Sequence, residues 1–209
     1  MSARKSKLAY GVGTMDADYA VKKYENWHEN GCRKQKLLWI CPFYMKWNSM
    51  LQRCYSEKFL EKYPTYRGFS VCQEWLTFSN FKAWMEKQDW EHKHLDKDIL
   101  FPGNKIYSPA TCVFIDPKVN TFITESNASR GEWLIGVCWH KAANKFISMC
   151  RDGSGKRKHL GLFDTELESH KAWVEYKLKL AYQLAAEQSD ERIAQALIAR
   201  YENYMSDQS

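Results

Sequence analysis

The chain has 209 residues, of which 44% are hydrophobic and 15% aromatic, and a formal net charge of +6. A chain of this length and apolar content can form one or two compact domains with buried cores, which excludes an intrinsically disordered protein. No apolar run approaches the roughly 20 residues of a membrane span, and the first residues do not lead into a signal sequence. We therefore expect a soluble, cytoplasmic protein with no membrane partner.

The seven cysteines are irregularly spaced, and none forms a Cys-x-x-Cys pair. An odd number without a pattern favours free thiols in a reducing compartment over a disulfide framework. The alternative is a zinc site made of the first four, Cys32, Cys41, Cys54 and Cys72. Their spacing fits no common pattern of zinc ligands, so we do not expect zinc.

The N-terminal half begins with a polar stretch over 1–15, which predicts a flexible arm. Within 16–27, Tyr19, Ala20, Lys23, Tyr24 and Trp27 then lie at i, i+1, i+4, i+5 and i+8, a spacing typical of one face of a helix. Similar stripes predict helices over 44–55 and 77–87. Between those two helices, 64–69 has the composition of a turn and a short strand.

Aromatic residues are concentrated between positions 39 and 90. Base-stacking on a nucleic acid is one use for such residues, but we expect most of them to form a core that supports the segment that follows. Arg53 lies among them, and two roles are open for it. It could reach a DNA phosphate, or it could pack against aromatic rings.

The most informative segment is 94–100, His-Leu-Asp-Lys-Asp-Ile-Leu. If it forms a strand, alternation places His94, Asp96 and Asp98 on one face. Two carboxylates and an imidazole on one face are costly to bury without a partner, and a divalent cation is a suitable one. A solvated, charged edge strand is the alternative that the spacing leaves open.

The elements around this segment follow a recognisable order. A Gly-Asn turn at 103–104 precedes a second expected strand over 111–115 and a helix entered at Pro117, with Asn120 in its first turn. This order of elements resembles the HNH nuclease motif, and so do the short segments Leu-Asp-Lys-Asp-Ile-Leu, Gly-Asn-Lys, Tyr-Ser-Pro and Cys-Val-Phe. The form is the one found in free-standing homing endonucleases of tailed phages.

This resemblance implies a metal-dependent DNA endonuclease in which one or both of Asp96 and Asp98, with Asn120, hold a single Mg²⁺ or Mn²⁺ ion. Their hard oxygen ligands suit such ions better than zinc. The familiar HNH nuclease has a histidine directly beside the metal-binding residue, where this chain has Lys97. His94, two residues before Asp96, is then the best available base for the attacking water. One such site cuts one strand, so we expect a nick.

A second group of elements follows a polar, linker-like stretch over 126–132. Three short segments separated by turn residues predict an antiparallel meander: 134–140, 145–150 and 158–163. Thr165 and Glu168 have the spacing of a capping box, which predicts a helix running to about residue 184. A last amphipathic helix is expected over 189–205, with Ser189 as its cap, and either docks on the second domain or binds a partner.

Three strands and one packed helix, with Ala128-Ser129-Arg130-Gly131, Ile135-Gly136-Val137 and Leu160-Gly161-x-Phe163, resemble the plant Apetala-type (ethylene-response-factor) DNA-binding domain. Phage endonucleases of this group often carry that domain behind their HNH unit, so the resemblance implies double-stranded DNA as partner. Residues 140–158 hold six basic residues and one acid, which also favours a polyanion.

Alternation leaves open whether the Trp139/Lys141 set or the His140 set faces the DNA. The residues expected at the DNA are these: Arg53, Trp139, Lys141, Lys145, Arg151, Lys156, Arg157 and Lys158.

The sequence as a whole predicts an α+β protein made of several parts: a flexible arm (1–15), an HNH-like nuclease domain (16–125, with the ββα unit at about 93–125), a linker (126–132), a DNA-binding domain (133–186) and a C-terminal helix (187–209). If the gene is carried by a phage, the host cytoplasm is the expected location. The oligomeric state is open, with a monomer as one option. The alternative function is a catalytically decayed HNH protein acting as a sequence-specific DNA-binding or protein-interaction module, because the usual histidine beside Asp96 is missing.

Overall fold

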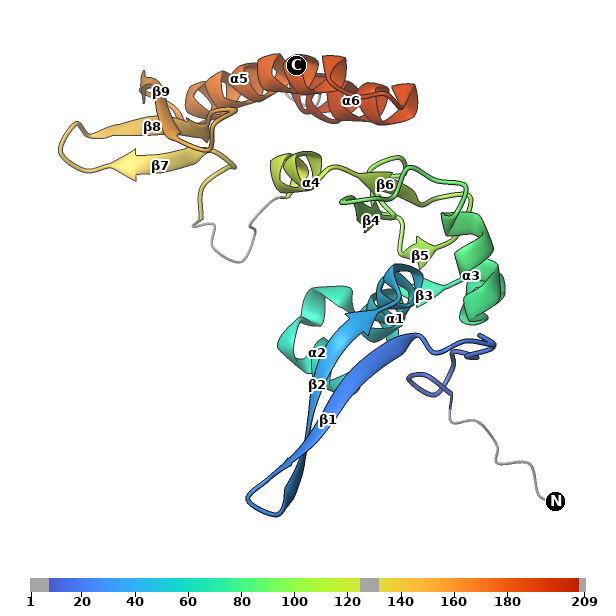
Figure 1. Ribbon diagram of the computed structural model, residues 1–209. Coiled ribbons are helices and arrows are strands. Elements are labelled where there is room, and N and C mark those ends of the chain that lie inside the picture. Colours follow the sequence, from blue (N-terminus) through green and yellow to red (C-terminus); the bar gives the residue numbers. More distant parts are fainter. Residues whose placement is uncertain (1–7, 125–131, 207–209) are drawn as a thin grey trace. The chain divides into compact units, whose positions relative to one another are not determined.

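The computed structural model describes residues 8–124 and 132–206, with the side chains of 205 and 206 left out. The structure is α+β and divides into two compact units, Met1–Asp116 and Pro117–Ser209 (Figure 1). The expected linker at 126–132 lies, except for Glu132, outside the described residues, as does the first half of the expected arm. Among the described helices, none is both long enough and apolar enough to cross a membrane.

The first unit begins with a β-hairpin where a helix was expected over 16–27. Strand β1 (Lys22–Glu29) pairs antiparallel with β2 (Cys32–Ile40), and the two turn residues, Asn30 and Gly31, have φ angles of +50° and +74°. Positive φ at both positions defines the tight turn that Asn-Gly favours, whose twist matches that of the strands. The helix prediction was wrong because the Asn-Gly turn reverses the chain within reach of a second strand, and this pairing overrides the helix-like spacing of 16–27.

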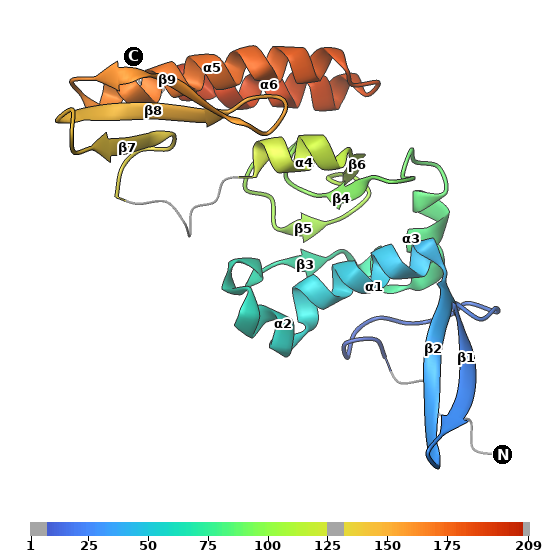
Figure 2. The same cartoon turned by 60° about the vertical axis from the view of Figure 1, so that its left-hand side comes forward.

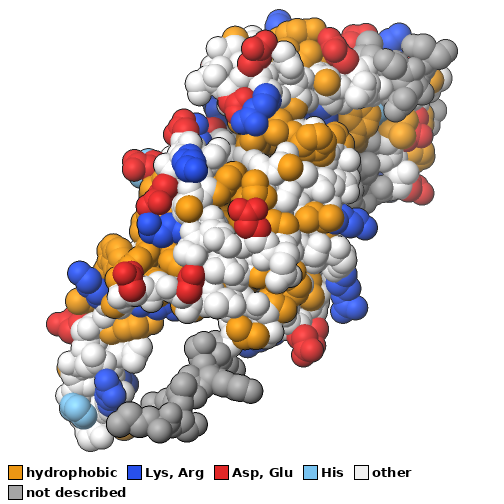
Figure 3. All heavy atoms as spheres, turned by 90° about the vertical axis from the view of Figure 1, so that its right-hand side faces the viewer, with side chains coloured by type: hydrophobic (Ala, Val, Ile, Leu, Met, Phe, Trp, Pro, Cys, Tyr) orange, Lys and Arg blue, Asp and Glu red, His pale blue; other side chains and the backbone are white. Residues whose placement is uncertain are grey.

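The hairpin projects from the rest of the first unit in both ribbon views (Figures 1 and 2). Every residue from 23 to 39 is exposed, so neither face of the two-stranded sheet packs on the unit's core. In the space-filling view, the free end of the hairpin at the lower left carries basic and histidine side chains (Figure 3).

The core of the first unit is built by helices α1 (Pro42–Tyr55) and α3 (Phe78–Met85), which confirms both helix predictions there. The stripe expected on α1 is buried: Trp47, Met50, Leu51 and Cys54. The indole Nε1 of Trp47 donates a hydrogen bond of 2.7 Å to the carbonyl oxygen of Trp75, and its ring lies 5.5 Å from that of Phe78. The aromatic residues in this region thus form a core, as expected.

Shorter elements connect these helices to the segment of interest. They are α2 (Glu57–Lys62), the 3-10 turns η1 (Pro64–Tyr66) and η2 (Gln73–Leu76), and the two-residue strand β3 (Ser70–Val71). The turn and short strand expected near 64–69 are therefore present, with the strand starting at Ser70.

Two further strand pairs hold that segment. Strand β3 pairs in parallel with β5 (Ile106–Tyr107), and β4 (His94–Asp96) pairs antiparallel with β6 (Val113–Ile115). The second strand expected over 111–115 is present, whereas the first, expected over 94–100, stops at Asp96. Helix α4 (Pro117–Ile123) begins at the predicted proline and belongs to the second unit.

The second unit contains the predicted meander. Strands β7 (Val137–His140), β8 (Lys145–Arg151) and β9 (Arg157–Phe163) form one antiparallel sheet in the order β7-β8-β9. Helix α5 (Glu166–Ala186) lies against this sheet (Figure 2). The capping box is confirmed, since Thr165 Oγ1 accepts from the backbone N–H of Glu168 at 3.2 Å and the Glu168 carboxylate accepts from Thr165 N at 3.1 Å.

The C-terminal helix α6 (Glu191–Ser206) packs against α5. Its stripe is buried through Ile193, Leu197 and Tyr201, so the helix docks within the chain. The predicted cap at Ser189 was wrong by one residue. The carboxylate of Asp190 accepts from the backbone N–H of Arg192 at 3.0 Å, because an aspartate can satisfy a free amide in the first helical turn.

A matched pair of glycine substitutions tests the packing of the second unit. Gly136 and Gly155 have almost the same φ, +83° and +85°, but a Cβ on Gly136 would lie 2.1 Å from the Trp173 ring, whereas one on Gly155 would meet nothing within 4 Å. A left-handed conformation costs an L residue about 1 kcal/mol, and overpacking adds about 1–3 kcal/mol. We therefore expect Gly155→Ala to lower the free energy of unfolding by about 1 kcal/mol and Gly136→Ala by about 3 kcal/mol.

Urea unfolding followed by circular dichroism measures both losses. Equal losses in the two variants would contradict the contact between Gly136 and Trp173.

Candidate functional site

The carboxylate of Asp96 marks the point where β4 ends. Its Oδ1 accepts the backbone N–H of Asp98 at 3.0 Å and that of Ile99 at 2.7 Å. A side chain that binds the backbone two and three residues ahead turns the chain away from an extended path. Asp98 therefore does not belong to the strand, and the expectation that His94, Asp96 and Asp98 share one strand face was wrong for Asp98.

The surroundings of Asp96 disfavour its charged form. Burial raises the pKa of its carboxyl group above the ordinary value, and the neighbouring charge of Asp98 raises that pKa further. The backbone donors of Ile99 and Asp98 and the ammonium of Lys97 act in the opposite direction, but their effect is smaller. A carboxylate held at an energetic cost is frequent at functional sites.

Lys97 follows Asp96 directly, and its side chain is buried. Its Nζ lies 3.9 Å from the ring centroid of Phe69, 5.7 Å from that of Tyr107, and 3.0 Å from Asp98 Oδ2. The aromatic faces and the carboxylate replace part of the hydration that the ammonium group loses on burial. Lys97 thus anchors the turn after β4, and it is not placed to take a proton from water.

Asn104 closes the loop that follows. Its Nδ2 donates to the carbonyl oxygens of Lys97 at 2.7 Å and Ile106 at 2.8 Å, and its Oδ1 accepts from Ile106 N at 3.2 Å. Gly103, with a φ of +79°, provides the left-handed residue just before it. The Gly-Asn pair of the motif therefore has a structural role, because it holds the connection between β4 and β5.

His94 is exposed on β4, opposite Ile115 of β6. Because side chains alternate along a strand, His94 and Asp96 lie on one side of β4, while Leu95 is buried on the other. Lys46 of α1 lies beside this strand, since its Nζ donates to the carbonyl oxygen of Lys93. Burial lowers the pKa of Lys46, and the charge of Arg53 lowers it further.

Sequence reasoning missed Lys46. A lysine within an amphipathic helix usually marks the solvated side, so the pattern gave no sign that this one would lie at the β4 edge.

Arg53 packs against an aromatic ring, which is one of the two roles left open for it. Its guanidinium carbon lies 5.6 Å from the Tyr107 centroid, and its Nε donates to Ser49 O at 3.3 Å. A contact between Arg53 and a DNA phosphate stays a prediction.

The donor set at β4 is small. Across residues 8–124 and 132–206, no three His, Cys, Asp or Glu side chains come together closely enough to hold a metal ion. That part of the chain includes the four cysteines of the zinc alternative, and each of the seven cysteines is a free thiol in the structure. A hydrated Mg²⁺ ion needs only one or two protein carboxylates, so Asp96 and Asp98 are suitable donors for it. Asn120 belongs to the second unit.

The sheet of the second unit has two different sides. Val137, Ser148 and Cys150 are buried on the side of α5, and Lys158 lies on that side too, with its Nζ 4.8 Å from the Tyr176 ring of α5. The cross-strand pair Trp139–Phe146, with ring centroids 4.8 Å apart, follows Val137–Ser148 by two residues and therefore shares their side. Trp139 and Lys158, both expected at the DNA, are thus on the α5 side.

The other side of the sheet, here called the open face, carries His140. Three cross-strand pairs place their side chains on this face: His140 with Lys145, Met149 with His159, and Arg151 with Arg157. The basic members of the open face are these: His140, Lys145, Arg151, Arg157 and His159. Lys141 and Lys156 are exposed in the adjoining turns. The His140 set, not the Trp139 set, therefore faces away from α5.

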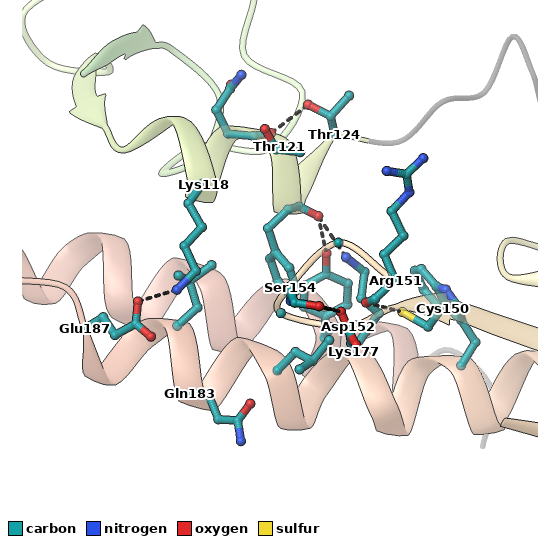
Figure 4. A pocket seen from close by; sticks show the side chains of 18 of the residues that line it. Lys118, Thr121, Thr124, Cys150, Arg151, Asp152, Ser154, Lys177, Gln183 and Glu187 are labelled. Carbon is teal, nitrogen blue, oxygen red and sulfur yellow. Dashed lines mark hydrogen bonds and ion pairs between the residues drawn. The ribbon is translucent and has the colours of Figure 1, made fainter. Parts of the chain in front are cut away.

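Helix α4 is fixed to α5 beside a pocket that includes Asn120 (Figure 4). Lys118 of α4 forms an ion pair of 2.6 Å with Glu187. Lys177 of α5 donates to the carbonyl oxygen of Phe122 at 2.9 Å, with its Nζ 3.6 Å from the Phe122 ring centroid. The position of Asn120 is therefore set by contacts within the second unit.

Comparison of the chain with protein-family models, with curated proteins and with solved structures found no match.

The raised pKa of Asp96 gives a pH-dependent prediction. A carboxyl group whose pKa is raised on folding binds its proton more tightly in the folded state than in the unfolded state. The free energy of unfolding therefore falls as the pH rises above the unfolded pKa of about 3.9, and it stays lower at neutral pH. Asp96→Asn removes the charge and keeps the oxygen that accepts both N–H groups. We expect it to be more stable than the parent at pH 7, with the gain shrinking toward pH 3.

Urea midpoints at pH 3, 5 and 7 in EDTA measure this difference. Asp89→Asn, at an exposed carboxylate, is the control and should show no such gain. An Asp96→Asn variant that is less stable than the parent at pH 7 would contradict the unfavourable burial of this charge.

Proposed function

We propose that this protein is a metal-dependent DNA endonuclease of the HNH type, which nicks duplex DNA bound by its C-terminal sheet. One observation carries the proposal: the exposed imidazole of His94 and the constrained carboxylate of Asp96 stand two residues apart on the same side of β4. The antiparallel pairing of β4 with β6, and the helix that starts at Pro117, follow the order of elements in the HNH motif.

Asp96 and Asp98 are the proposed metal ligands in the first unit. The hydrogen bonds of Asp96 to the turn use Oδ1, while Asp98 uses Oδ2 in its pair with Lys97. Each carboxylate has a second oxygen, and such hard donors suit Mg²⁺ or Mn²⁺. When bound, the ion supplies charge stabilisation for the leaving 3′ oxygen. Asn120, the third ligand that the resemblance implies, stays a sequence-based prediction.

His94 is the proposed general base. Proton transfer from water requires an accessible group that accepts a proton near neutral pH, and an imidazole is the side chain best suited to this. Lys97 cannot take this role, because its ammonium group is buried over Phe69 and paired with Asp98. In this proposal Lys97 and Asn104 are positioning residues, which hold the turn that carries both carboxylates.

The open face of the sheet is the proposed DNA-binding surface. The major groove is wide enough to admit β-strands, and Arg side chains can pair with base edges there or with phosphates. On this face, Arg151 and Arg157 are cross-strand neighbours and both are exposed. Two arginines held side by side cost electrostatic repulsion, which a bound polyanion would relieve.

A catalytically decayed nuclease that only binds DNA is the second candidate. The observation that favours it is the replacement of the usual histidine by the buried Lys97. Metal dependence separates the two candidates, since binding alone needs no divalent ion.

Asp96→Ala should abolish cleavage and leave DNA binding intact. Removing a carboxylate ligand should slow nicking of supercoiled plasmid at least about 100-fold, because even outer-shell changes at metal sites cost 10–100-fold. The assay compares Mg²⁺, Mn²⁺ and EDTA and follows conversion to the open-circle form. Asp89→Ala, which removes an exposed carboxylate paired with Lys93, is the matched control and should cut normally.

Unchanged cleavage by Asp96→Ala would overturn the site. Binding without cleavage by the parent protein in either metal would favour the decayed nuclease.

Adjacent substitutions on β9 test the open face. Arg157 lies on that face, whereas Lys158 lies over Tyr176 on the α5 side, and each loses one positive charge when changed to alanine. If Arg157 contacts a phosphate, Arg157→Ala should reduce the log–log slope of affinity against salt concentration by about 0.9. Lys158→Ala should change the slope much less.

Fluorescence anisotropy with a labelled duplex about three helical turns long, at several salt concentrations, measures the slopes. The same reduction in both variants would mean that the two sides of the sheet contribute equally, which contradicts the assignment.

A further inference from the structure

The β1–β2 hairpin is the largest part of the first unit that the proposed site does not use. A two-stranded hairpin with neither face packed on a core is marginally stable in water. This one also exposes large apolar side chains, among them Tyr24, Trp27 and Leu37, at 41%, 41% and 46%. Exposed apolar groups on a projecting element are frequent in surfaces that bind a partner.

The register divides the hairpin's polar residues unequally between its two faces. On one face, here called the ribbon face, the cross-strand pairs are Tyr24 with Leu37, Asn26 with Gln35, and His28 with Arg33. Arg33 Nη2 donates to Asn26 Oδ1 at 3.3 Å, in agreement with this placement. The ribbon face holds none of the acidic residues of β1 and β2.

Both acids of the hairpin lie on the opposite face. There Glu29 pairs with Cys32, Trp27 with Lys34, and Glu25 with Lys36. The hairpin as a whole is basic, but on this opposite face the lysines alternate with glutamates. A polyanion would therefore be accepted better by the ribbon face than by the opposite face.

The side chains of the ribbon face are those that read base edges. Arg pairs with guanine, and Asn and Gln pair with adenine, each through two hydrogen bonds in the major groove. A two-stranded β-ribbon fits that groove, and eight residues of strand extend about 26 Å, which lets the tip reach DNA while the base stays with the core. The chemistry of this face is therefore that of a duplex DNA reader.

We propose that the ribbon face enters a groove of duplex DNA and reads base edges with Asn26, Arg33 and Gln35, as a recognition element separate from the β7–β9 sheet. The inference rests on the proposed function insofar as both need duplex DNA as partner. It does not depend on cleavage.

Neighbouring residues on opposite faces provide the test. Arg33→Ala and Lys34→Ala each remove one exposed positive charge, one from the ribbon face and one from the opposite face. Asn26→Ala/Gln35→Ala changes the ribbon face without changing charge. The probe is a pool of duplexes with about two helical turns of randomised base pairs, from which each protein selects its preferred sequences in EDTA, so that cleavage plays no part.

We expect Arg33→Ala and Asn26→Ala/Gln35→Ala to lose base preference over one block of positions, and to bind the parent's selected duplex at least about tenfold more weakly. Lys34→Ala should keep the preference and bind within about twofold. Arg157→Ala should alter a different block. Equal thermal midpoints would show that all four variants fold.

Four outcomes would overturn the proposal. If Arg33→Ala and Lys34→Ala weakened DNA binding equally, the hairpin would attract DNA only through its positive charge and would not read bases. Normal binding and preference in the ribbon-face variants, with weakening by Arg157→Ala, would refute the hairpin alone and leave the proposed function standing. A concentration-dependent dimer that these variants abolish, without effect on DNA binding, would assign the hairpin to a second copy of this chain. If the parent protein bound no duplex even at low salt, the proposed function and this inference would fail together.

Discussion

The burial of the Lys97 ammonium group is the constraint on which the candidate site depends. The group keeps its charge away from water because Phe69 and Tyr107 face it and because Asp98 pairs with it at 3.0 Å. Removing any of these partners would expose the full desolvation cost of a buried charge. The chain must therefore turn directly after Asp96, and the Asp96 carboxylate forms that turn by accepting two backbone N–H groups. The residue that departs from the familiar motif thus determines where both carboxylates lie.

Small irregularities in strand pairing decide which charges face outward. The β8–β9 ladder shifts register between Ser148 and Met149, so Cys150 pairs with Lys158 and Arg151 with Arg157. Without that shift Arg151 would face Lys158, and Arg157 would move to the α5 side, because one residue of slip reverses a strand's faces. The β1–β2 ladder contains a similar shift between Lys23 and Tyr24. The open face of the β7–β9 sheet therefore depends on its bulge, whereas the ribbon-face pairs of the hairpin keep one continuous register from the Asn30–Gly31 turn to Tyr24.

The success of sequence reasoning followed the strength of local signals. The capping box at Thr165 and Glu168 needs only a side chain and a backbone amide within one helical turn, and it was found as predicted. The meander was predictable because its turn residues separate three alternating segments. The prediction of an N-terminal helix was wrong. Tyr24 and Trp27 have helical spacing, but Asn30 and Gly31 favour a hairpin, and in that hairpin Tyr24 and Trp27 lie on opposite faces. The sequence did not predict where β4 ends, because that end depends on contacts of Lys97 with residues distant in the chain. Phe69 lies 28 residues before Lys97, and Tyr107 lies ten residues after it.

Features that oppose stability are concentrated where function is proposed. Asp96 is held where burial disfavours its charge, Arg151 and Arg157 are paired across two strands, and the hairpin exposes aromatic side chains on an unpacked ribbon. A single substitution at Asp96, or at either arginine, could relieve the first or the second of these costs. Proteins tend to retain such costs where activity or binding requires them, and to lose them elsewhere. In the proposed function, a bound cation would supply counter-charge at Asp96, and DNA would supply it at the arginine pair. A groove entered by the ribbon face would cover Tyr24 and Leu37, whereas Trp27 would stay exposed on the opposite face.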